Sequence, residues 1–301
     1  MGKPSEFLSY GALITSAVVW GGSIVGQKIA LDAFSAVETS VVRGLGALAI
    51  LIPLWWWHEG RRVKFSKGDL VSLALLSLGV LGNHLLTLFG LRYIGAAEAG
   101  VIIGAGPAIT AFLSSLLIGD VPFRAVWLGC AISFGGVALV SSTASGTAGD
   151  QPLVGGGLVV LGMASWALYS IYGRETMKRF SPLTVNWTTL LLSILLQIPL
   201  LAVDHKALVE GVASVSLSGW LAMGYLIVFA TALGQQAWLY GVQGIGPSRA
   251  GIFLNLIPVS ALVCSALILK ERIDLTEVVG IALILAGVWL VNRQSAQRAS
   301  K

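Results

Sequence analysis

The sequence predicts an all-α integral membrane protein whose ten transmembrane helices form two inverted halves of five. Three observations indicate this fold class. Hydrophobic residues make up 56% of the chain and charged residues only 11%, whereas a soluble domain carries roughly a quarter charged residues. The apolar residues gather in stretches that are long enough to cross a bilayer. The two halves of the chain also repeat the same landmark residues in the same order.

Each predicted span is an apolar stretch close to the length that a bilayer requires, which is about 20 residues. The spans are 9–30, 37–57, 69–90, 93–118, 123–142, 153–174, 182–203, 217–240, 246–270 and 274–292. The small and polar stretch from Ser142 to Pro152 divides them five and five and is typical of a flexible connector. We therefore predict a first repeat over residues 1–141, a connector over 142–152 and a second repeat over 153–301.

The repeat is visible as matched landmarks at a fixed offset. An offset of 151 aligns glycines, prolines and helix-end acids: Gly90 with Gly241, Gly100 with Gly251, Pro107 with Pro258, Asp120 with Glu271 and Gly136 with Gly287. In the earlier part of each half, an offset of 146 aligns Trp20 with Trp166 and Pro53 with Pro199. Because each repeat has an odd number of spans, the second enters the membrane from the opposite side. Inverted repeats are typical of secondary transporters, which bind substrate near the midplane.

Basic residues predict the orientation. Most Lys and Arg residues, including Arg61, Arg62, Lys64 and Lys67, fall in segments on one side of the predicted spans. Lys and Arg favour the cytoplasmic side, so both termini are expected to be cytoplasmic. The same topology explains the net charge of +5 without a nucleic-acid partner. The first apolar run lacks a small-residue cleavage site and is expected to be a retained helix.

Several stretches resemble a known transporter family. PVSALVCSALILKERIDLTEVVGIALILAGVWLV, which begins at Pro258, resembles the end of an EamA repeat, as do PAITAFLSSLLIGD and LGCAISFGGVALV in the first half. WGGS at Trp20 and VVRGLGALAI around Arg43 resemble the first and second helices of that repeat. Over nearly its whole length the chain is similar to the drug/metabolite transporter superfamily. Thr189 stands at the position that matches Arg43, so Arg43 is not duplicated.

The resemblance also implies a function. The tryptophan-rich first helices resemble those of the YddG-type amino-acid exporters. This similarity implies export of aromatic and other amphipathic amino acids, or of related metabolites, across a bacterial inner membrane. The partners expected are therefore a small-molecule substrate and the lipid bilayer, and the protein is expected to be a monomer.

Four residues are predicted to form two hinges: Gly104 and Pro107 in one repeat, and Gly251 and Pro258 in the other. A proline inside a helix removes a backbone hydrogen bond, and in lipid the freed carbonyl must be satisfied by protein or cavity water. Both prolines are therefore expected to face the protein interior. We interpret them as hinges that open opposite ends of a central cavity in turn. A static kink that only improves packing is the alternative.

Polar and aromatic residues inside the spans are the candidates for substrate binding. They are Trp20, Ser23, Gln27, His84, Trp166, Tyr169, Gln235 and Asn255. An aromatic-walled cavity with few fixed charges suits an amphipathic solute such as an amino acid. Interface anchoring is the alternative for the two tryptophans. A structural hydrogen bond is the alternative for His84 and Asn255.

Two charges within the spans are predicted to pair. Arg43 and Glu98 lie at similar depths near the predicted outer ends of their helices, and a buried charge is costly unless it is paired. We therefore expect an Arg43–Glu98 ion pair near the outer gate. His84 and Glu98 are also the candidates for a proton path, although facilitated export without proton exchange explains the sequence equally well.

Covalent chemistry is not expected. The sequence has no nucleophile motif, no metal-ligand spacing and no phosphate-binding lysine motif. The two cysteines, Cys130 and Cys264, fall inside apolar runs and are interpreted as packing residues. We therefore predict neither an enzyme nor a cofactor or metal site. The alternatives are a drug or nucleotide-sugar carrier of the same superfamily, a membrane enzyme acting on lipid, and a channel.

Overall fold

The computed structural model describes residues 5–60, 63–94, 99, 102–103, 106–119, 124–143, 151–257, 259–260 and 275–299. Every regular element in these ranges is helical. Six helical segments are long and apolar enough to cross a membrane: Glu6–Ala33, Ala36–His58, Lys67–Gly90, Leu153–Thr176, Pro182–Ala202 and Leu217–Ile245. These segments support the predicted membrane-spanning class, and the count of ten spans stays a prediction.

The first half contains helices α1 (Glu6–Ala33), α2 (Ala36–His58), α3 (Lys67–Gly90), α5 (Gly106–Ile118) and α6 (Arg124–Thr143). Serine side chains cap the first three of these helices. Ser35 and Ser66 each form a capping box, with Glu38 and Asp69 respectively. Because a capping side chain accepts hydrogen bonds from the first backbone amides, each helix can begin directly after a short loop.

The second half contains α7 (Pro152–Thr176), α8 (Pro182–Gln197), the 3₁₀ turn η1 (Ile198–Ala202), α9 (Lys206–Glu210) and η2 (Val212–Ser214). A long span follows, formed by α10 (Leu217–Tyr225), the π-helical segment η3 (Leu226–Gly234) and α11 (Gln235–Ile245). After it come α12 (Pro247–Gly251), the 3₁₀ turn η4 (Ile252–Asn255) and α14 (Leu275–Ala299). The π-helical segment lies in the middle of its span.

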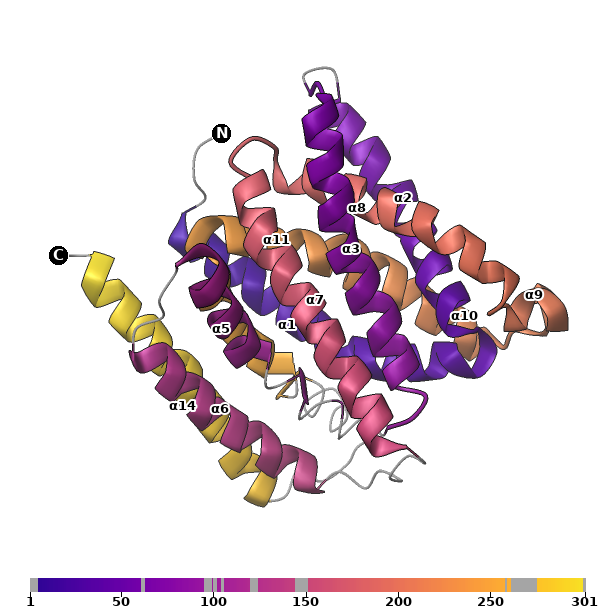
Figure 1. Cartoon of the computed structure of the whole chain (residues 1–301). Coiled ribbons are helices and arrows are strands. Elements are labelled where there is room, and N and C mark those ends of the chain that lie inside the picture. The colour runs from indigo at the N-terminus through magenta and orange to yellow at the C-terminus, as the bar shows by residue number, and fades with distance from the viewer. Residues whose placement is uncertain are drawn as a thin grey trace.

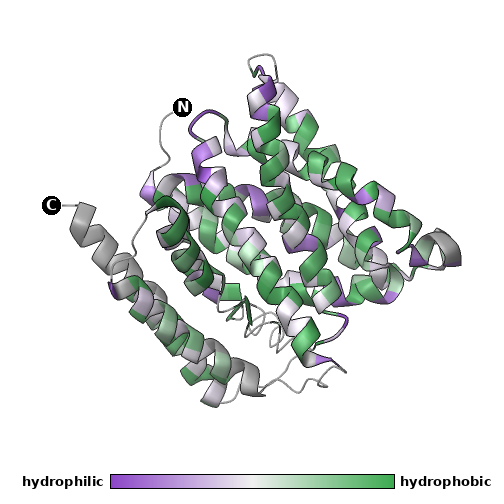
Figure 2. Cartoon of the chain, in the orientation of Figure 1, coloured by the Kyte–Doolittle hydropathy of each residue, from purple (hydrophilic) through white to green (hydrophobic). Residues whose placement is uncertain are grey.

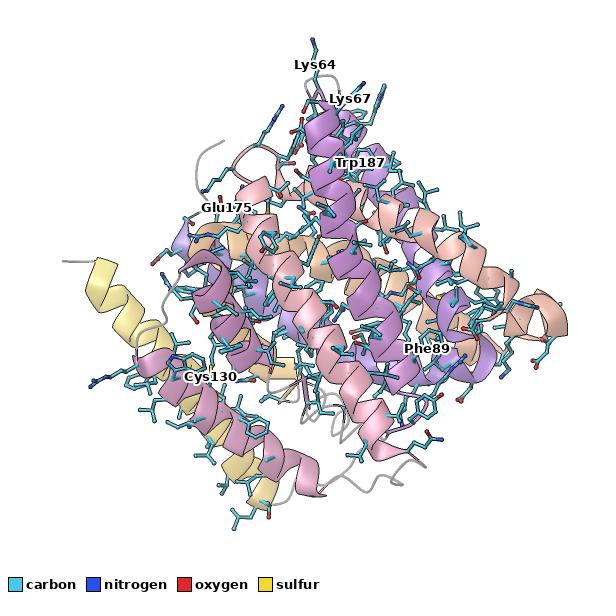
Figure 3. The ribbon with its side chains drawn as sticks, in the orientation of Figure 1. Lys64, Lys67, Phe89, Cys130, Glu175 and Trp187 are labelled. Atoms are coloured by element: carbon cyan, nitrogen blue, oxygen red, sulfur yellow. The ribbon has the colours of Figure 1, made fainter. Side chains whose placement is uncertain are left out.

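The surface of the bundle is largely apolar, as Figure 2 shows. Large apolar side chains on several helices point outward, and Leu75 and Leu153 are 64% and 91% exposed. An exposed apolar surface of this extent is expected where lipid, not water, surrounds the helices. In Figure 3, Lys64 and Lys67 lie at the beginning of α3, whereas Phe89 lies near its other end.

Helices α6 and α14 lie side by side at one edge of the molecule (Figure 1). Glycines allow their main chains to touch, because Gly136 lies against the main chain of Gly280 and Gly287 lies against that of Gly129. These contacts are reciprocal: an offset of 151 converts Gly129 to Gly280 and Gly136 to Gly287. Ser133 Oγ donates a hydrogen bond to the carbonyl oxygen of Ile284, 3.2 Å away.

Equivalent contacts recur in the main bundle, which is the group of helices that includes α1, α3, α7 and α11. Gly90 on α3 packs against Val159 on α7, and Gly241 on α11 packs against Leu13 on α1. The same offsets of 151 and 146 relate the first pair of residues to the second. Contact pairs that exchange partners in this way are the mark of a twofold relation between two similar surfaces.

Helices α2 and α8 run antiparallel and are joined at both ends by a carboxylate. Glu59, after α2, accepts hydrogen bonds from the hydroxyls of Ser181 (2.5 Å) and Thr184 (2.8 Å) in the first turn of α8. Asp204, after η1, accepts hydrogen bonds from the Val37 amide (2.9 Å) and the Arg92 guanidinium (3.0 Å). The end of each helix is thus tied to the beginning of the other.

Candidate substrate cavity

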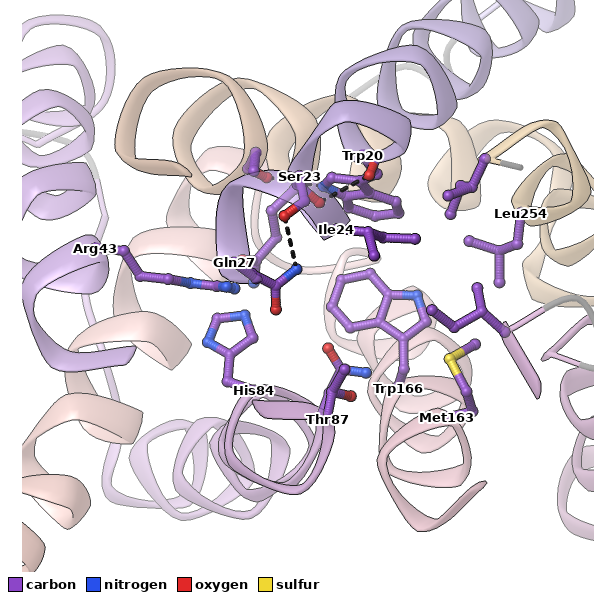
Figure 4. A pocket seen from close by; sticks show the side chains of 15 residues that line it. Trp20, Ser23, Ile24, Gln27, Arg43, His84, Thr87, Met163, Trp166 and Leu254 are labelled. Atoms are coloured by element: carbon purple, nitrogen blue, oxygen red, sulfur yellow. Dashed lines mark hydrogen bonds between the residues drawn. The ribbon is translucent and has the colours of Figure 1, made fainter. Parts of the chain in front are cut away.

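A cavity of about 100 Å³ lies among the spans of the main bundle. Residues from α1, α2, α3, α7, η3, α11 and η4 line it, so both halves of the chain contribute. The lining consists of Trp20, Ser23, Ile24, Gln27, Arg43, Asn83, His84, Thr87, Ile103, Met163, Trp166, Ala230, Gln235, Leu254 and Ile257. Figure 4 draws the side chains of these residues and labels ten of them.

Two indole rings, those of Trp20 and Trp166, form the aromatic wall, and the ring of Trp238 packs against them outside the lining. Trp20 and Trp166 meet edge to face, with ring centroids 5.3 Å apart and an interplanar angle of 83°. Trp238 packs against both, with centroid distances of 5.6 Å and 5.8 Å. Edge-to-face contacts at this spacing are favourable, so the wall is a rigid surface against which an aromatic or apolar solute can stack.

The two indole N–H groups have different environments. Trp20 Nε1 donates to the carbonyl oxygen of Ala230, 2.8 Å away, inside the π-helical segment η3. Trp166 Nε1 is buried and has no hydrogen-bond partner among the described residues. π-helical segments are frequent at functional sites, and here the segment supplies the carbonyl group that fixes the orientation of Trp20.

The polar end of the cavity is built by Arg43, Gln27 and His84, which lie together in Figure 4. Arg43 is 7% exposed and His84 is 6% exposed. Within the described part of the chain, Arg43 Nε and His84 Nδ1 have no hydrogen-bond partner, and neither does Thr87 Oγ1 on the adjacent turn. Buried polar atoms are nearly always satisfied in folded proteins, so this cluster is suited to a polar group of a bound solute.

Six of the eight residues predicted to bind substrate line this cavity: Trp20, Ser23, Gln27, His84, Trp166 and Gln235. The structure thus brings together residues from α1, α3, α7 and α11. Ser23 and Gln27 bond within their own helix, Ser23 Oγ to the carbonyl of Trp20 at 2.8 Å and Gln27 Nε2 to that of Ser23 at 3.2 Å. Their binding roles remain predictions.

The other two predicted binding residues lie behind the cavity wall. Tyr169 is fully buried, its ring packs at a tilt against Trp166 with 5.2 Å between centroids, and its hydroxyl lies 3.3 Å from Thr189 Oγ1. It also accepts a hydrogen bond of 3.4 Å from Gln235 Nε2, so it supports residues that line the cavity. Asn255 in η4 is fully buried outside the lining, and its two amide atoms have no partner among the described residues.

Of the predicted hinge residues, Pro107 and Gly251 are described. Pro107 is buried in the first turn of α5, and Gly251 ends α12, where the chain changes to the 3₁₀ turn η4. A methyl group placed on Gly251 would lie 3.5 Å from the Cα atom of Pro107, so the two segments touch. Gly104 and Pro258 lie outside the described residues, as does Glu98, and the predicted Arg43–Glu98 pair is not tested.

Some lining residues were not predicted. Arg43 was assigned to an ion pair, yet its side chain reaches the cavity. Asn83 and Thr87 flank His84 on α3, and their positions one turn apart could have indicated them. Met163, Leu254 and Ile257 are apolar residues in apolar spans, and nothing in such a context distinguishes lining from packing.

Comparison with known proteins identifies the protein family. The model of the EamA-like transporter family matches the chain twice, over residues 8–142 and 153–293. The chain belongs to the EamA-like transporter family. This EamA-like transporter is 27% identical over 282 residues to the uncharacterized transporter YyaM of Bacillus subtilis, covering 93% of this chain and 92% of YyaM. It is therefore a membrane transporter, a class of protein that is generally not enzymatic.

Two further relatives and one solved structure extend the comparison. The uncharacterized inner membrane transporter YedA of Escherichia coli K12 is 26% identical over 94% of this chain and 90% of its own. A probable terminal-alkyne amino-acid exporter of Streptantibioticus cattleyicolor is 24% identical over 95% and 94%. A crystal structure with 17% identity has a TM-score of 0.79 and covers 99% of this chain and 100% of its own, which shows the fold. This EamA-like transporter is a multi-pass protein of the inner membrane.

Proposed function

We propose that the protein is a secondary transporter that exports amino acids, aromatic and other amphipathic ones, or related metabolites by alternating access. The single observation that carries this proposal is the cavity between the two halves of the chain. It combines an aromatic wall at Trp20 and Trp166 with a polar end at Arg43 and His84. A cavity with one apolar and one polar end complements a solute that is itself amphipathic.

The reciprocal contacts support alternating access. Two inverted repeats related by a twofold axis can exchange conformations, which opens the cavity to each side of the membrane in turn. The Gly136–Gly280 and Gly129–Gly287 contacts, together with Gly90–Val159 and Gly241–Leu13, are those expected for such repeats. The change to 3₁₀ geometry after Gly251 supplies a place at which the backbone could bend.

The proposed substrate class draws on three further observations. One relative is described as a probable terminal-alkyne amino-acid exporter, and its similarity over nearly the whole chain favours an amino acid. A nucleotide sugar is disfavoured, because Arg43 is the only Lys or Arg among the described lining residues. The cavity of about 100 Å³ is also small beside the roughly 300 Å³ or more of typical drug-sized sites.

Uptake into proteoliposomes tests the proposal. The full-length protein would be reconstituted and given labelled phenylalanine or leucine, with and without an imposed pH gradient. We expect saturable uptake that unlabelled amino acid competes away, and uptake only with the gradient would indicate proton coupling. Trp166→Ala should abolish it, whereas Trp57→Ala, which changes a tryptophan that is 81% exposed, should not. Folded protein that takes up no amino acid would contradict the proposal.

A further inference from the structure

We propose that Arg43 binds the carboxylate of the transported solute, so that the cavity selects small carboxylates with an apolar or aromatic body and does not require an amino group. This inference rests on the proposed function in one respect, which is that a solute occupies this cavity. It goes further by naming the group that is recognised and the residue that recognises it.

The first step is the environment of Arg43. Only 7% of the residue is exposed, and its side chain extends from α2 into the cavity (Figure 4). Its Nε has no hydrogen-bond partner, and no ion pair to Arg43 occurs in the described part of the chain. A buried charge without a partner is costly, and an anionic solute entering the cavity would remove that cost.

The second step is the character of the neighbouring groups. Trp166 Nε1 can only donate a hydrogen bond, Thr87 Oγ1 can donate one, and neither has a partner among the described residues. In Figure 4 the Trp166 indole nitrogen lies on the side of its ring away from Arg43, so the Arg43 guanidinium and Thr87 are the donors that a carboxylate at the polar end, which only accepts, would satisfy. Arginine binds carboxylates through two parallel hydrogen bonds, which fixes their orientation.

The third step is what the lining lacks. Among the described lining residues there is no Asp or Glu, so nothing there pairs with an ammonium group. Met163 and Leu254 lie on the opposite side of Trp166 from Arg43 in Figure 4. The solute body would therefore extend along the Trp166 ring toward these apolar side chains, with its carboxylate at Arg43.

Three ligands with the same phenyl ring separate these requirements. Phenylalanine carries both charged groups, 3-phenylpropionate carries only the carboxylate, and phenethylamine carries only the ammonium. Binding to the purified full-length protein would be measured by isothermal titration calorimetry. We expect 3-phenylpropionate and phenylalanine to bind with affinities within about tenfold of each other. Phenethylamine should show at least tenfold weaker binding than either acid.

Variants of Arg43 assign the effect to this side chain. Arg43→Gln should lower the affinity for both acids at least tenfold, and Arg43→Lys, which keeps the charge, should retain part of it. Arg124→Gln is the matched control, because it removes the same charge from an exposed position at the beginning of α6. Glu98→Gln tests the competing ion pair: if Glu98 holds Arg43 permanently, only this change would open the site to carboxylates.

The outcomes distinguish this inference from the proposed function. Equal binding of phenethylamine and 3-phenylpropionate, or no binding of either acid, would overturn the inference, and these measurements need no variant that could fail to fold. Wild-type affinity in Arg43→Gln, or carboxylate binding only in Glu98→Gln, would also overturn it. Carboxylate binding without amino-acid uptake would retain Arg43 as the anchor and overturn amino-acid export. Phenylalanine uptake together with equal binding of phenethylamine and 3-phenylpropionate would support amino-acid export and overturn Arg43 as the carboxylate anchor.

Discussion

Individual residues in the cavity differ in whether the described part of the protein supplies a partner for their hydrogen-bonding groups. Trp20 and Trp166 occupy matching positions in the two halves, yet among the described residues only Trp20 has an acceptor for its indole N–H. A buried donor without a partner costs about 1–3 kcal/mol. Within the described part of the chain Trp166 has no acceptor, and a bound solute is one group that would supply it.

Replacing each tryptophan with phenylalanine separates the two roles. Trp20→Phe removes a hydrogen bond that the folded chain makes, so we expect the free energy of unfolding to fall by about 1 kcal/mol. Trp166→Phe removes no hydrogen bond to the described residues, so stability should change less while the KM for uptake of an aromatic substrate rises. Thermal unfolding in detergent and uptake kinetics measure the two effects. A larger loss of stability in Trp166→Phe than in Trp20→Phe would contradict this assignment.

The sequence indicated several of the residues that line the cavity, and there is a physical reason why it did not indicate the others. Depth within a span and repeat matching indicated Trp20, Trp166 and His84, because these are properties of position along a helix. The direction of a long side chain is not such a property. Position along the helix did not show that the Arg43 side chain lines the cavity, or that Tyr169 packs against Trp166 outside the lining, and the expected Arg43–Glu98 pair stays a prediction.

At the scale of helices, two glycines with different surroundings have different roles. Gly136 on α6 lies against the carbonyl of Gly280 on α14, where a methyl group would be only 2.5 Å from that oxygen. At Gly251 the nearest neighbour of a methyl group would be 3.4 Å away, at Thr110. The first glycine is required for close packing, whereas the second has room for a side chain.

Alanine at each position therefore gives opposite results. Gly136→Ala must push α6 away from α14, and we expect a loss of about 1–3 kcal/mol in unfolding free energy. Gly251→Ala fits the space and restricts the backbone where helix α12 changes to η4. We expect unchanged stability and a lower maximal uptake rate. Uptake at the wild-type rate in a normally folded Gly251→Ala protein would support the static kink.

The helix bounds were predictable because a bilayer demands a fixed apolar length. The predicted spans 37–57 and 69–90 agree closely with α2 and α3. The π-helical segment η3 was not predicted. Hydropathy indicates which residues face lipid, and not which carbonyl oxygen accepts the hydrogen bond of each backbone amide. The same applies to the 3₁₀ turn after Gly251.

For the molecule as a whole, the paired ends of α2 and α8 connect the two halves. At one end the Asp204 carboxylate joins the first turn of α2 to Arg92. Partial burial raises the pKa of the Asp204 carboxyl, but hydrogen bonds from Val37, Arg92 and Ser35 outweigh it, so the pKa lies below its usual value. The charged form is therefore favoured in the folded protein.

This lowered pKa predicts a dependence of stability on pH. The contribution of Asp204 is fully present above the usual carboxyl pKa and is lost as the pH falls through the lower value of the folded protein. Because Arg92 is 39% exposed, solvent screening keeps the contribution at about 1 kcal/mol or less. The melting temperature of Asp204→Asn should be below wild type at pH 7, and the difference should shrink toward pH 3. Glu210→Gln, at an exposed acid, is the control and should show no such difference.

The contact among the indole rings of Trp20, Trp166 and Trp238 has a practical consequence. Tryptophan emission responds to polarity and to contact, and Trp20, Trp166 and Trp238 are grouped at one cavity among the ten tryptophans of the chain. A solute that touches this group would change the fluorescence spectrum of the unlabelled protein. The difference between the spectra of the wild type and Trp166→Phe would isolate that signal. The protein thus carries its own optical reporter of occupancy, which can be read in the purified protein without any added dye.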